Sequence, residues 1–220
     1  MSHQLNRYLQ ETLKKSRVKV SQPAACPRIA LHLFDPDVLE GPISHDEAQA
    51  IVAEPAYWSF CWASGQVLAQ YILDHPDYVR DKVVADFGSG SGVVAIAAAM
   101  AGAKQVYACD IDQHALTACE LNASLNHVSV SCVQDIKQIR EPIDFILAAD
   151  VLYDKDNFPC LDLFLEQAQE VMLADSRIKH LPSQAYHQLA CIEARTWPDL
   201  NEFEEFNQVR IYHSAGAPET

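Results

Sequence analysis

The stretch VVADFGSGSGVVAIAAAM, from Val83 to Met100, places three glycines between two of the most apolar runs of the chain. Val83–Phe87 predicts a short buried strand, and Val93–Ala101 predicts an alanine-rich helix that ends at Gly102. Glycine permits positive φ and lets a ligand approach bare backbone, while the start of a helix leaves amide N–H groups free for an acceptor. This strand–loop–helix unit therefore predicts a ligand site at the tip of a buried strand.

Strands and helices alternate at short spacing around this unit. We expect further strands at Arg28–Phe34, Val106–Asp110, Val128–Val133, Ile143–Ala149, Val171–Ala174, Gln188–Arg195 and Gln208–Tyr212. We expect further helices at Gly65–Leu73, capped by Ser64, from Asp112 to Asn126, and at Phe158–Gln169. The apolar strands are typical of a parallel sheet covered on both faces, and the missing helix between the last two strands predicts antiparallel pairing. The sequence thus predicts an α/β, Rossmann-like three-layer sandwich, whose mostly parallel sheet has about seven strands and an antiparallel C-terminal hairpin strand.

The N-terminus differs from the rest of the chain. Apolar residues recur there at helical spacing within a basic segment, at Leu5, Tyr8, Leu9 and Leu13. We expect residues 1–45 to form an N-terminal helix and strand appendage, and residues 46–220 to form the main domain. The basic segment lacks the apolar core and the cleavage site of a secretory signal, so we expect a cytoplasmic protein. A mitochondrial presequence, and with it a matrix location, stays a minor alternative.

The charge balance limits the partners that the chain can take. Its 220 residues carry 16 basic and 30 acidic side chains, for a formal net charge of −14. Such a field repels phosphate backbones, so we expect no nucleic-acid partner, and it favours cationic partners such as lysine-bearing protein surfaces. No apolar run reaches the roughly 18 residues of a membrane span. Neither the nine histidines nor the seven cysteines have metal-ligand spacing. We therefore expect neither a membrane association nor a bound metal.

The spacing of the glycines narrows the ligand. Gly88, Gly90 and Gly92 form G-x-G-x-G, whereas the dinucleotide fingerprint needs a third glycine where this chain has Val93. Asp86 precedes the loop, and an acid there suits a ligand with positive groups rather than a pyrophosphate. The pattern resembles motif I of the class I S-adenosylmethionine (SAM)-dependent methyltransferases.

Acids at the next two strand tips agree with a nucleoside ligand. Asp110 ends the following strand, where a carboxylate can accept hydrogen bonds from both ribose hydroxyls. Dehydrogenases share this acid, so it does not discriminate between the two ligand classes. In methyltransferases the third tip carries an acid or amide that takes the adenine amino group. Asp135 matches that position, with Ile111 and Ile136 as apolar neighbours of the ring.

Three further segments resemble a subgroup of the class I methyltransferases. They read EPAYWSFCWASGQVLAQYI (Glu54–Ile72), DIDQHALTACELNASLN (Asp110–Asn126) and AADVLYD (Ala148–Asp154). The subgroup contains protein-lysine methyltransferases, among them those of the electron-transfer flavoprotein β subunit, and bacterial nicotinamide-methyltransferase-like relatives. The resemblance covers roughly residues 50–155 well and the remainder loosely. It implies SAM as cofactor and S-adenosylhomocysteine as product.

The resemblance also implies roles for single residues. Trp62 matches a tryptophan that lies over the cofactor, and Ala149 matches a residue that lines it. Asp150 and Tyr153 match the acid-x-x-aromatic motif at the strand tip that faces the transferred methyl, which makes them the candidate catalytic residues. The implied cofactor site comprises Trp62, Asp86, Gly88, Ser89, Gly90, Gly92, Asp110, Ile111, Asp135 and Ala149.

We therefore expect an enzyme that N-methylates a lysine side chain of a protein by in-line methyl transfer from SAM. The Asn-Pro-Pro-aromatic motif of nucleobase and glutamine methyltransferases is absent. A small-molecule amine N-methyltransferase with a nicotinamide-like substrate is the first alternative. A nucleotide-dependent oxidoreductase and a non-catalytic SAM-binding adaptor are more distant alternatives. For Trp58 and Trp62, a shared buried packing face is the alternative to a functional role.

Overall fold

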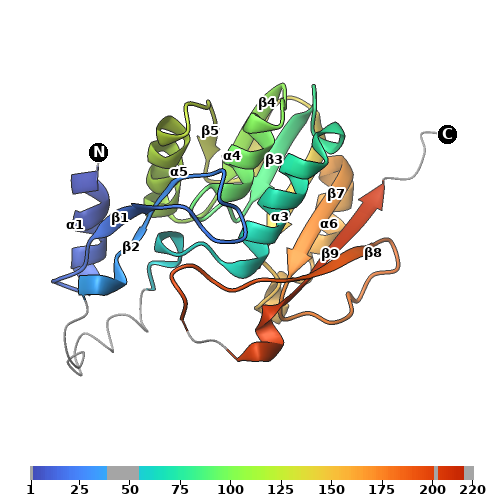
Figure 1. The fold of residues 1–220 in the computed structure, drawn as a ribbon. Helices are drawn as coiled ribbons and strands as arrows, with labels where there is room; N and C mark the ends of the chain where they lie inside the picture. Colours follow the sequence, from blue (N-terminus) through green and yellow to red (C-terminus); the bar gives the residue numbers. More distant parts are fainter. Residues whose placement is uncertain (1, 39–54, 201–202, 216–220) are drawn as a thin grey trace.

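A seven-stranded sheet passes through the computed structural model, which describes residues 2–38, 55–200 and 203–215 (Figure 1). The strand order is β5-β4-β3-β6-β7-β9-β8. The strands are β3 (Val83–Phe87), β4 (Gln105–Cys109), β5 (Ser131–Val133), β6 (Ile143–Ala149), β7 (Ala168–Asp175), β8 (His187–Glu193) and β9 (Gln208–Ala215). The pairs among β3 to β7 are parallel, and β9 is antiparallel to both β7 and β8. This arrangement confirms the predicted mostly parallel sheet with an antiparallel strand at its C-terminal end.

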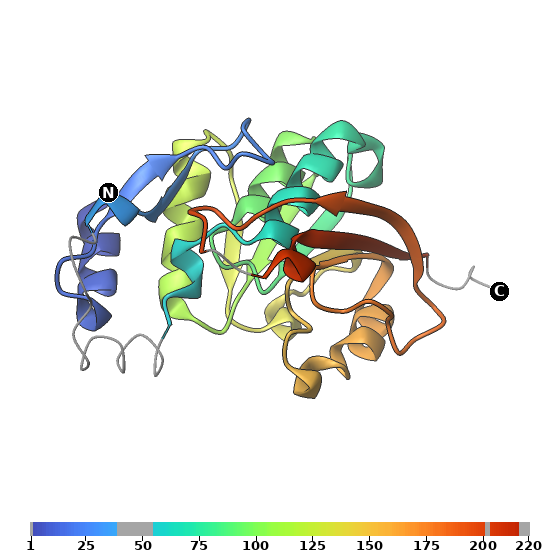
Figure 2. The same ribbon diagram turned by 60° about the horizontal axis from the view of Figure 1, so that its bottom comes forward.

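The direction of chain travel reverses at β3, which fixes where a ligand can bind. From β3 the chain steps outward to β4 and β5, and then returns to place β6 and β7 on the other side. In sheets of this kind, ligands bind beyond the carboxyl ends of the strands at such a reversal. The arrowhead of β7 points to the bottom of Figure 1, and Figure 2 turns that edge toward the viewer.

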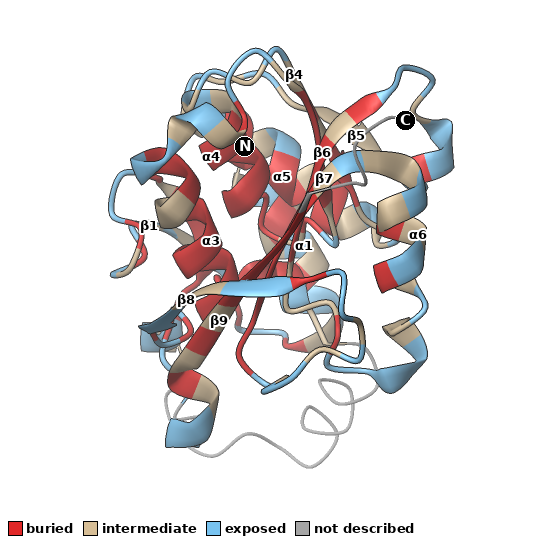
Figure 3. Ribbon diagram, turned by 90° about the vertical axis from the view of Figure 1, so that its right-hand side faces the viewer, coloured by how far each residue is buried: buried red, intermediate tan, exposed pale blue. Residues whose placement is uncertain are grey.

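Helices cover the two faces of the sheet unequally. Among the described residues, three helices pack on one face, namely α3 (Ala63–Asp74), α4 (Val93–Met100) and α5 (Gln113–Leu125). Helix α6 (Cys160–Gln167) packs on the other face. Because successive residues of a strand point to opposite faces, Val84 joins the core on the α4 side and Ala85 the core on the α6 side. Figure 3 shows the central strands buried, while β8 at the edge is largely exposed.

The structure corrects the predicted boundary between the last helix and the strand that follows it. Helix α6 ends at Gln167 and β7 begins at Ala168, so the predicted helix Phe158–Gln169 is too long and the predicted strand Val171–Ala174 is too short. β7 pairs with β6 from Ala168 opposite Ile143. The ladder hydrogen bonds of that pairing override the helical spacing of the apolar residues.

The N-terminal segment forms a separate layer beside α5. It consists of α1 (Ser2–Thr12) and an antiparallel ribbon of β1 (Val18–Ser21) and β2 (Leu31–Phe34). The predicted strand was longer than β2, and the four-residue β1 carries too short a pattern to be predicted. Leu5 and Leu9 of α1 are buried against α5 and Trp58. The predicted domain boundary at residues 45 and 46 lies outside the described residues.

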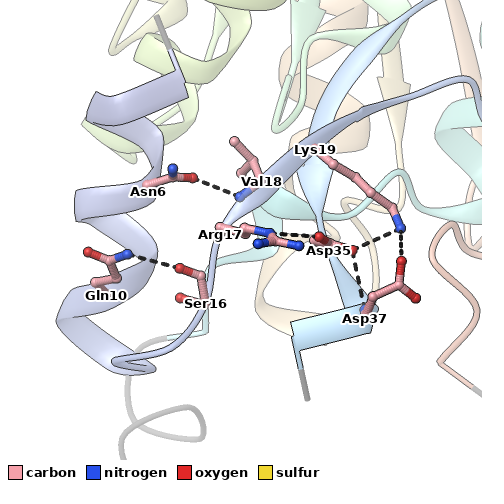
Figure 4. A network of polar contacts seen from close by, with 8 residues as sticks. All are labelled: Asn6, Gln10, Ser16, Arg17, Val18, Lys19, Asp35 and Asp37. Carbon is pink, nitrogen blue, oxygen red and sulfur yellow. Dashed lines mark hydrogen bonds and ion pairs between the residues drawn. The ribbon is translucent and has the colours of Figure 1, made fainter. Parts of the chain in front are cut away.

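A polar network holds this layer together (Figure 4). The Asn6 side chain of α1 accepts a hydrogen bond from the backbone N–H of Val18 at 2.8 Å. The Lys19 ammonium lies 2.8 Å from Asp35 and 2.7 Å from Asp37. Its hydrogen bond lowers the pKa of the Asp35 carboxyl to about 2, and Arg17 contributes a second hydrogen bond. The layer is thus fixed by its own ion pairs as well as by its apolar contacts.

Asn122 of α5 joins the N-terminal layer to the glycine loop. Its Oδ1 accepts from the backbone N–H of His32 in β2 at 2.8 Å, and its Nδ2 donates to the carbonyl of Ser91 at 2.8 Å. One turn later, Asn126 donates to and accepts from the backbone of Ala30. Because Asn122 is fully buried, β2 and the loop depend on one side chain for these backbone contacts.

Replacing Asn122 by alanine should lower the free energy of unfolding by about 2–4 kcal/mol, because it leaves a buried N–H and a buried C=O without partners. Urea unfolding of Asn122→Ala would measure the loss. Ser124→Ala is the matched control, since Ser124 is exposed on the same helix and should change stability by less than about 0.5 kcal/mol. Equal unfolding midpoints for the two variants would contradict this role of Asn122.

Candidate active site

The tips of β3, β4 and β6 lie level at the edge of the sheet where strand order reverses. Phe87 at the end of β3 pairs with Cys109 of β4 on one side and with Ala148 of β6 on the other. The residues that follow these positions therefore leave the sheet together. They are the glycine loop, Asp110, and the segment that begins with Ala149 and Asp150.

The three glycines of the loop all have positive φ, but they differ in the space that a side chain would find at each position. A Cβ on Gly88 (φ 70°) would lie 2.8 Å from Val151, and one on Gly92 (φ 81°) would lie 2.6 Å from the Cys119 sulfur. A Cβ on Gly90 (φ 50°) would meet only the Gly88 carbonyl, at 4.0 Å. Gly88 and Gly92 thus serve close packing, whereas Gly90 leaves open space beside bare backbone.

Ser89 supplies a second sign of a ligand at this loop. Its hydroxyl is buried and has no hydrogen-bond partner among the described residues. An unpaired buried hydroxyl is costly unless a bound molecule or water satisfies it. Together with the open space at Gly90, it fits a polar ligand such as the methionine part of SAM, which the loop and the neighbouring carboxylates would hold.

The carboxylate of Asp86 lies behind the loop rather than at its surface. The residue is 1% exposed, and its Oδ2 accepts from the backbone N–H of Ala95 in the first turn of α4 at 2.9 Å. Burial raises the pKa of the Asp86 carboxyl to about 7. Asp86 therefore stabilises the first turn of α4. It lies behind the glycine loop and does not contact a ligand at the loop surface directly.

Asp110 lies beside the loop and faces it directly. Its Oδ2 accepts from the Gly90 N–H at 2.8 Å and its Oδ1 from the Asp112 N–H at 3.0 Å. Burial raises its pKa. The next residue, Ile111, is 91% exposed, so this apolar side chain is available to a ligand.

The third strand tip contributes less than the sequence suggested. Asp135 is exposed, and its Oδ1 accepts from the Lys137 N–H at 2.9 Å, where it caps a short 3-10 turn. Ile136 is 3% exposed and packs in the core on the α6 side, so it does not flank a ligand ring. Of the two isoleucines considered, only Ile111 is accessible at the site.

Aromatic side chains gather on the other side of the loop. Trp62 precedes α3, its Nε1 donates to the Tyr57 carbonyl at 3.1 Å, and its ring lies 5.8 Å from that of Tyr57. Tyr57 in turn lies 6.2 Å from Tyr153, ring centre to ring centre. Trp58 is 1% exposed and packs under the N-terminal layer, so Trp58 and Trp62 do not share a buried face. Tyr57 was not predicted, because its place at the site depends on Tyr153, which is far from it in the sequence.

Asp150 connects the tip of β6 to α3. Its Oδ1 accepts from the Ser64 hydroxyl at 2.6 Å and from the Ser176 hydroxyl at 3.3 Å, and its Oδ2 faces the Ser64 N–H at 3.3 Å. Asp150 itself has φ 52°, and its N–H donates to the carbonyl of Ala174. The predicted cap by Ser64 is thus wrong: Trp62 occupies the N-cap, and the Asp150 carboxylate satisfies the first turn of α3 instead.

Burial raises the pKa of the Asp150 carboxyl to about 6, and the nearby Asp175 carboxylate adds to the shift. The hydrogen bonds from Ser64 act in the opposite direction. Four carboxyl groups with raised pKa therefore surround the strand tips, namely Asp86, Asp110, Asp150 and Asp175. Such a set favours a cationic ligand, because a positive charge would stabilise their ionised forms.

The described residues give no sign of two other kinds of site. None of their helices has the length and apolar character to cross a bilayer. Within the same residues, the histidine, cysteine, aspartate and glutamate side chains form no group of three or more that could hold a metal ion. Glu54, at the start of the upstream segment, lies outside the described residues.

Two glycine variants should separate packing from ligand binding. Gly92→Ala should lower the free energy of unfolding by about 2–4 kcal/mol, through strain at positive φ and the clash with Cys119. Gly90→Ala should cost only about 1 kcal/mol of stability but weaken SAM binding at least about tenfold, because its methyl group fills the open space at the loop. Urea unfolding and calorimetric titration measure the two effects. Unchanged SAM affinity in Gly90→Ala would contradict the assignment.

Ionisation of Asp86 should lower the free energy of unfolding of the ligand-free protein as pH rises. Its folded pKa of about 7 lies above the ordinary value of 3.8, so the folded state binds the proton more tightly and stability falls between about pH 4 and pH 7. Asp86→Asn keeps an acceptor for Ala95 without the charge. It should therefore stabilise the protein at pH 8 by about 1–3 kcal/mol and flatten this pH dependence. A lower melting temperature than the wild type at pH 8 would contradict this account.

Comparison with known proteins relates this geometry to a family. The model of ribosomal protein L11 methyltransferase (PrmA) matches residues 67–154. The electron transfer flavoprotein beta subunit lysine methyltransferase of Rattus norvegicus is 36% identical over 152 residues, covering 65% of this chain and 60% of the rat protein. Its homolog in Caenorhabditis elegans is 32% identical over 171 residues, covering 69% of this chain and 68% of the worm protein.

A solved structure gives the same result at the level of the fold. The ribosomal protein L11 methylase of Lactobacillus delbrueckii subsp. bulgaricus superposes with a TM-score of 0.51 at 26% identity, covering 70% of this chain and 79% of that one. The region matched by the PrmA family model, residues 67–154, contains the glycine loop, Asp110 and the β6 tip. These are the features on which the resemblance in the sequence rests. The chain belongs to the class I SAM-dependent methyltransferases, in the family of the electron transfer flavoprotein beta subunit lysine methyltransferases.

Proposed function

We propose that this protein transfers the methyl group of SAM to the ε-amine of a lysine side chain on a protein. The observation that carries the proposal is the end of β6, where Asp150 follows the strand and Tyr153, three residues later, lies 6.2 Å from Tyr57, ring centre to ring centre. The Tyr57 and Tyr153 side chains are 51% and 59% exposed. A side chain presented by another protein can reach this edge from outside. The names of the rat and worm relatives point to the same chemistry.

Bound SAM would supply an activated methyl group on a cationic sulfur, which a neutral amine attacks in line. The residues available to hold it are the loop from Gly88 to Gly92, the Asp110 carboxylate and the apolar surface of Ile111 and Trp62. The protein's contribution is orientation and exclusion of water, and proximity alone can account for roughly 7–11 kcal/mol of a barrier.

The acceptor lysine must lose its proton before it can react. With an ordinary pKa near 10.4, deprotonation at pH 7 costs about 5 kcal/mol. Asp150 cannot reduce this cost, because a neighbouring negative charge raises the pKa of an ammonium group. We assign Asp150 instead to capturing and aiming the ammonium, while it also anchors the first turn of α3 and thereby Trp62. The proton would leave to water as the amine enters the drier site.

Asp150→Asn should keep SAM affinity within about twofold and lower kcat at least about 100-fold, since the amide can still accept from Ser64 but no longer attracts the ammonium. As pH falls through about 6, where Asp150 of the ligand-free protein takes up a proton, kcat/KM of the wild type should fall more steeply than that of Asp150→Asn. Asp156→Asn is the matched control, because Asp156 is an exposed acid on the same connection between β6 and α6. Calorimetry and methyl-labelled SAM measure the two quantities.

The recombinant electron transfer flavoprotein beta subunit is the first acceptor to assay, with nicotinamide in a parallel reaction. Label on a lysine of the protein, lost in Asp150→Asn and kept in Asp156→Asn, is the expected result. Label on nicotinamide alone would make the small-molecule alternative the correct one. Loss of SAM affinity with unchanged turnover in Asp150→Asn would overturn the role given to Asp150.

A further inference from the structure

We propose that Tyr57 and Tyr153 together form an aromatic wall at the entrance for the acceptor side chain, and that the Tyr57 ring selects an aliphatic ammonium. The inference deepens the proposed function and rests on it, since it names the residue that recognises the acceptor. Tyr153 belongs to the acid-x-x-aromatic motif, whereas nothing in the sequence singles out Tyr57.

The two rings come from distant segments and still lie together. Their centres are 6.2 Å apart and their planes are tilted by 44°. Each ring is more than half exposed, although Tyr153 follows the mostly buried strand β6 and Tyr57 precedes the fully buried Trp58. Large aromatic side chains that gather uncovered at a strand tip are typical of a binding site rather than of packing.

The backbone of Tyr57 is fixed, so its ring is presented in one place. Tyr57 begins a 3-10 turn, Tyr57–Ser59, whose next residue, Trp58, is anchored in the core. The Tyr57 carbonyl accepts from the Trp62 Nε1 at 3.1 Å and from the Phe60 N–H at 3.2 Å. These bonds use only main-chain atoms of Tyr57 and leave its side chain free for a ligand.

The charge around the two rings matches a cation. The carboxylates of Asp110 and Asp154 act on the Tyr153 hydroxyl, and Asp150 lies at the same strand tip. Ring faces attract ammonium groups within about 6 Å of their centres. A lysine side chain that lies across the two rings would place its apolar stem against them and its ammonium near these acids. A neutral planar acceptor such as nicotinamide would stack on the two rings but would not be attracted by these carboxylates.

The first experiment measures binding without turnover. The probe is n-butylammonium, added to the protein saturated with S-adenosylhomocysteine and followed by chemical shifts of the aromatic side chains, with n-butanol as the neutral analogue. Tyr57→Ala should weaken n-butylammonium binding about tenfold, and Tyr57→Phe should stay within about twofold of the wild type, because the ring face is kept. SAM affinity should stay within about twofold in Tyr57→Phe, which keeps both the carbonyl and the ring that contact Trp62.

The second experiment uses the electron transfer flavoprotein beta subunit as acceptor. Tyr57→Ala should raise KM for it about tenfold with little change in kcat, and Phe203→Ala should leave KM within about twofold. Phe203 is the matched control, because it is 76% exposed and also aromatic.

Equal n-butylammonium affinity in Tyr57→Ala and the wild type would overturn the inference. An equal KM effect in Phe203→Ala would do the same, because it would indicate unspecific apolar docking. An inactive wild type with intact, Tyr57-dependent n-butylammonium binding would contradict only the proposed acceptor.

Discussion

The hydrogen bonds between the Asp150 carboxylate and Ser64 are the interaction on which the rest of the site depends. They tie the first turn of α3 to the tip of β6, and α3 begins directly after Trp62. Trp62 in turn holds the carbonyl of Tyr57. One half-buried acid thus fixes the aromatic side of the site against the strand tips that carry the glycine loop. The cost of burying that acid is visible in its raised pKa.

The N-terminal layer belongs to the site through a chain of buried polar contacts. β2 binds Asn122 of α5, and Asn122 holds the carbonyl of Ser91 in the glycine loop. From the same layer, the packing of Leu5 and Leu9 reaches Trp58, next to Tyr57. The layer therefore supports both sides of the ligand site, although the sequence presents it only as an appendage. Its contribution is structural order at the loop rather than contact with a ligand.

The parts that could be predicted from the sequence are those with a local signature. Glycines at two-residue spacing after an apolar run, and acids at the ends of the next strands, define the loop and Asp110 whatever surrounds them. Contacts between distant segments have no such signature. The burial of Asp86 under α4, the cap that Asp150 gives to α3, and the pairing of Tyr57 with Tyr153 depend on which elements become neighbours. The same reason explains the boundary between α6 and β7, where pairing with β6 decides.

A crystal structure with S-adenosylhomocysteine would test the central claim most directly, namely that the edge formed by the β3, β4 and β6 tips is the cofactor site. We expect the bound molecule over Gly90, with its ribose hydroxyls at Asp110 and its sulfur toward Asp150. We also expect the Ser89 hydroxyl to gain the partner that it lacks. Density elsewhere on the protein, with the glycine loop and Ser89 unchanged, would contradict the account.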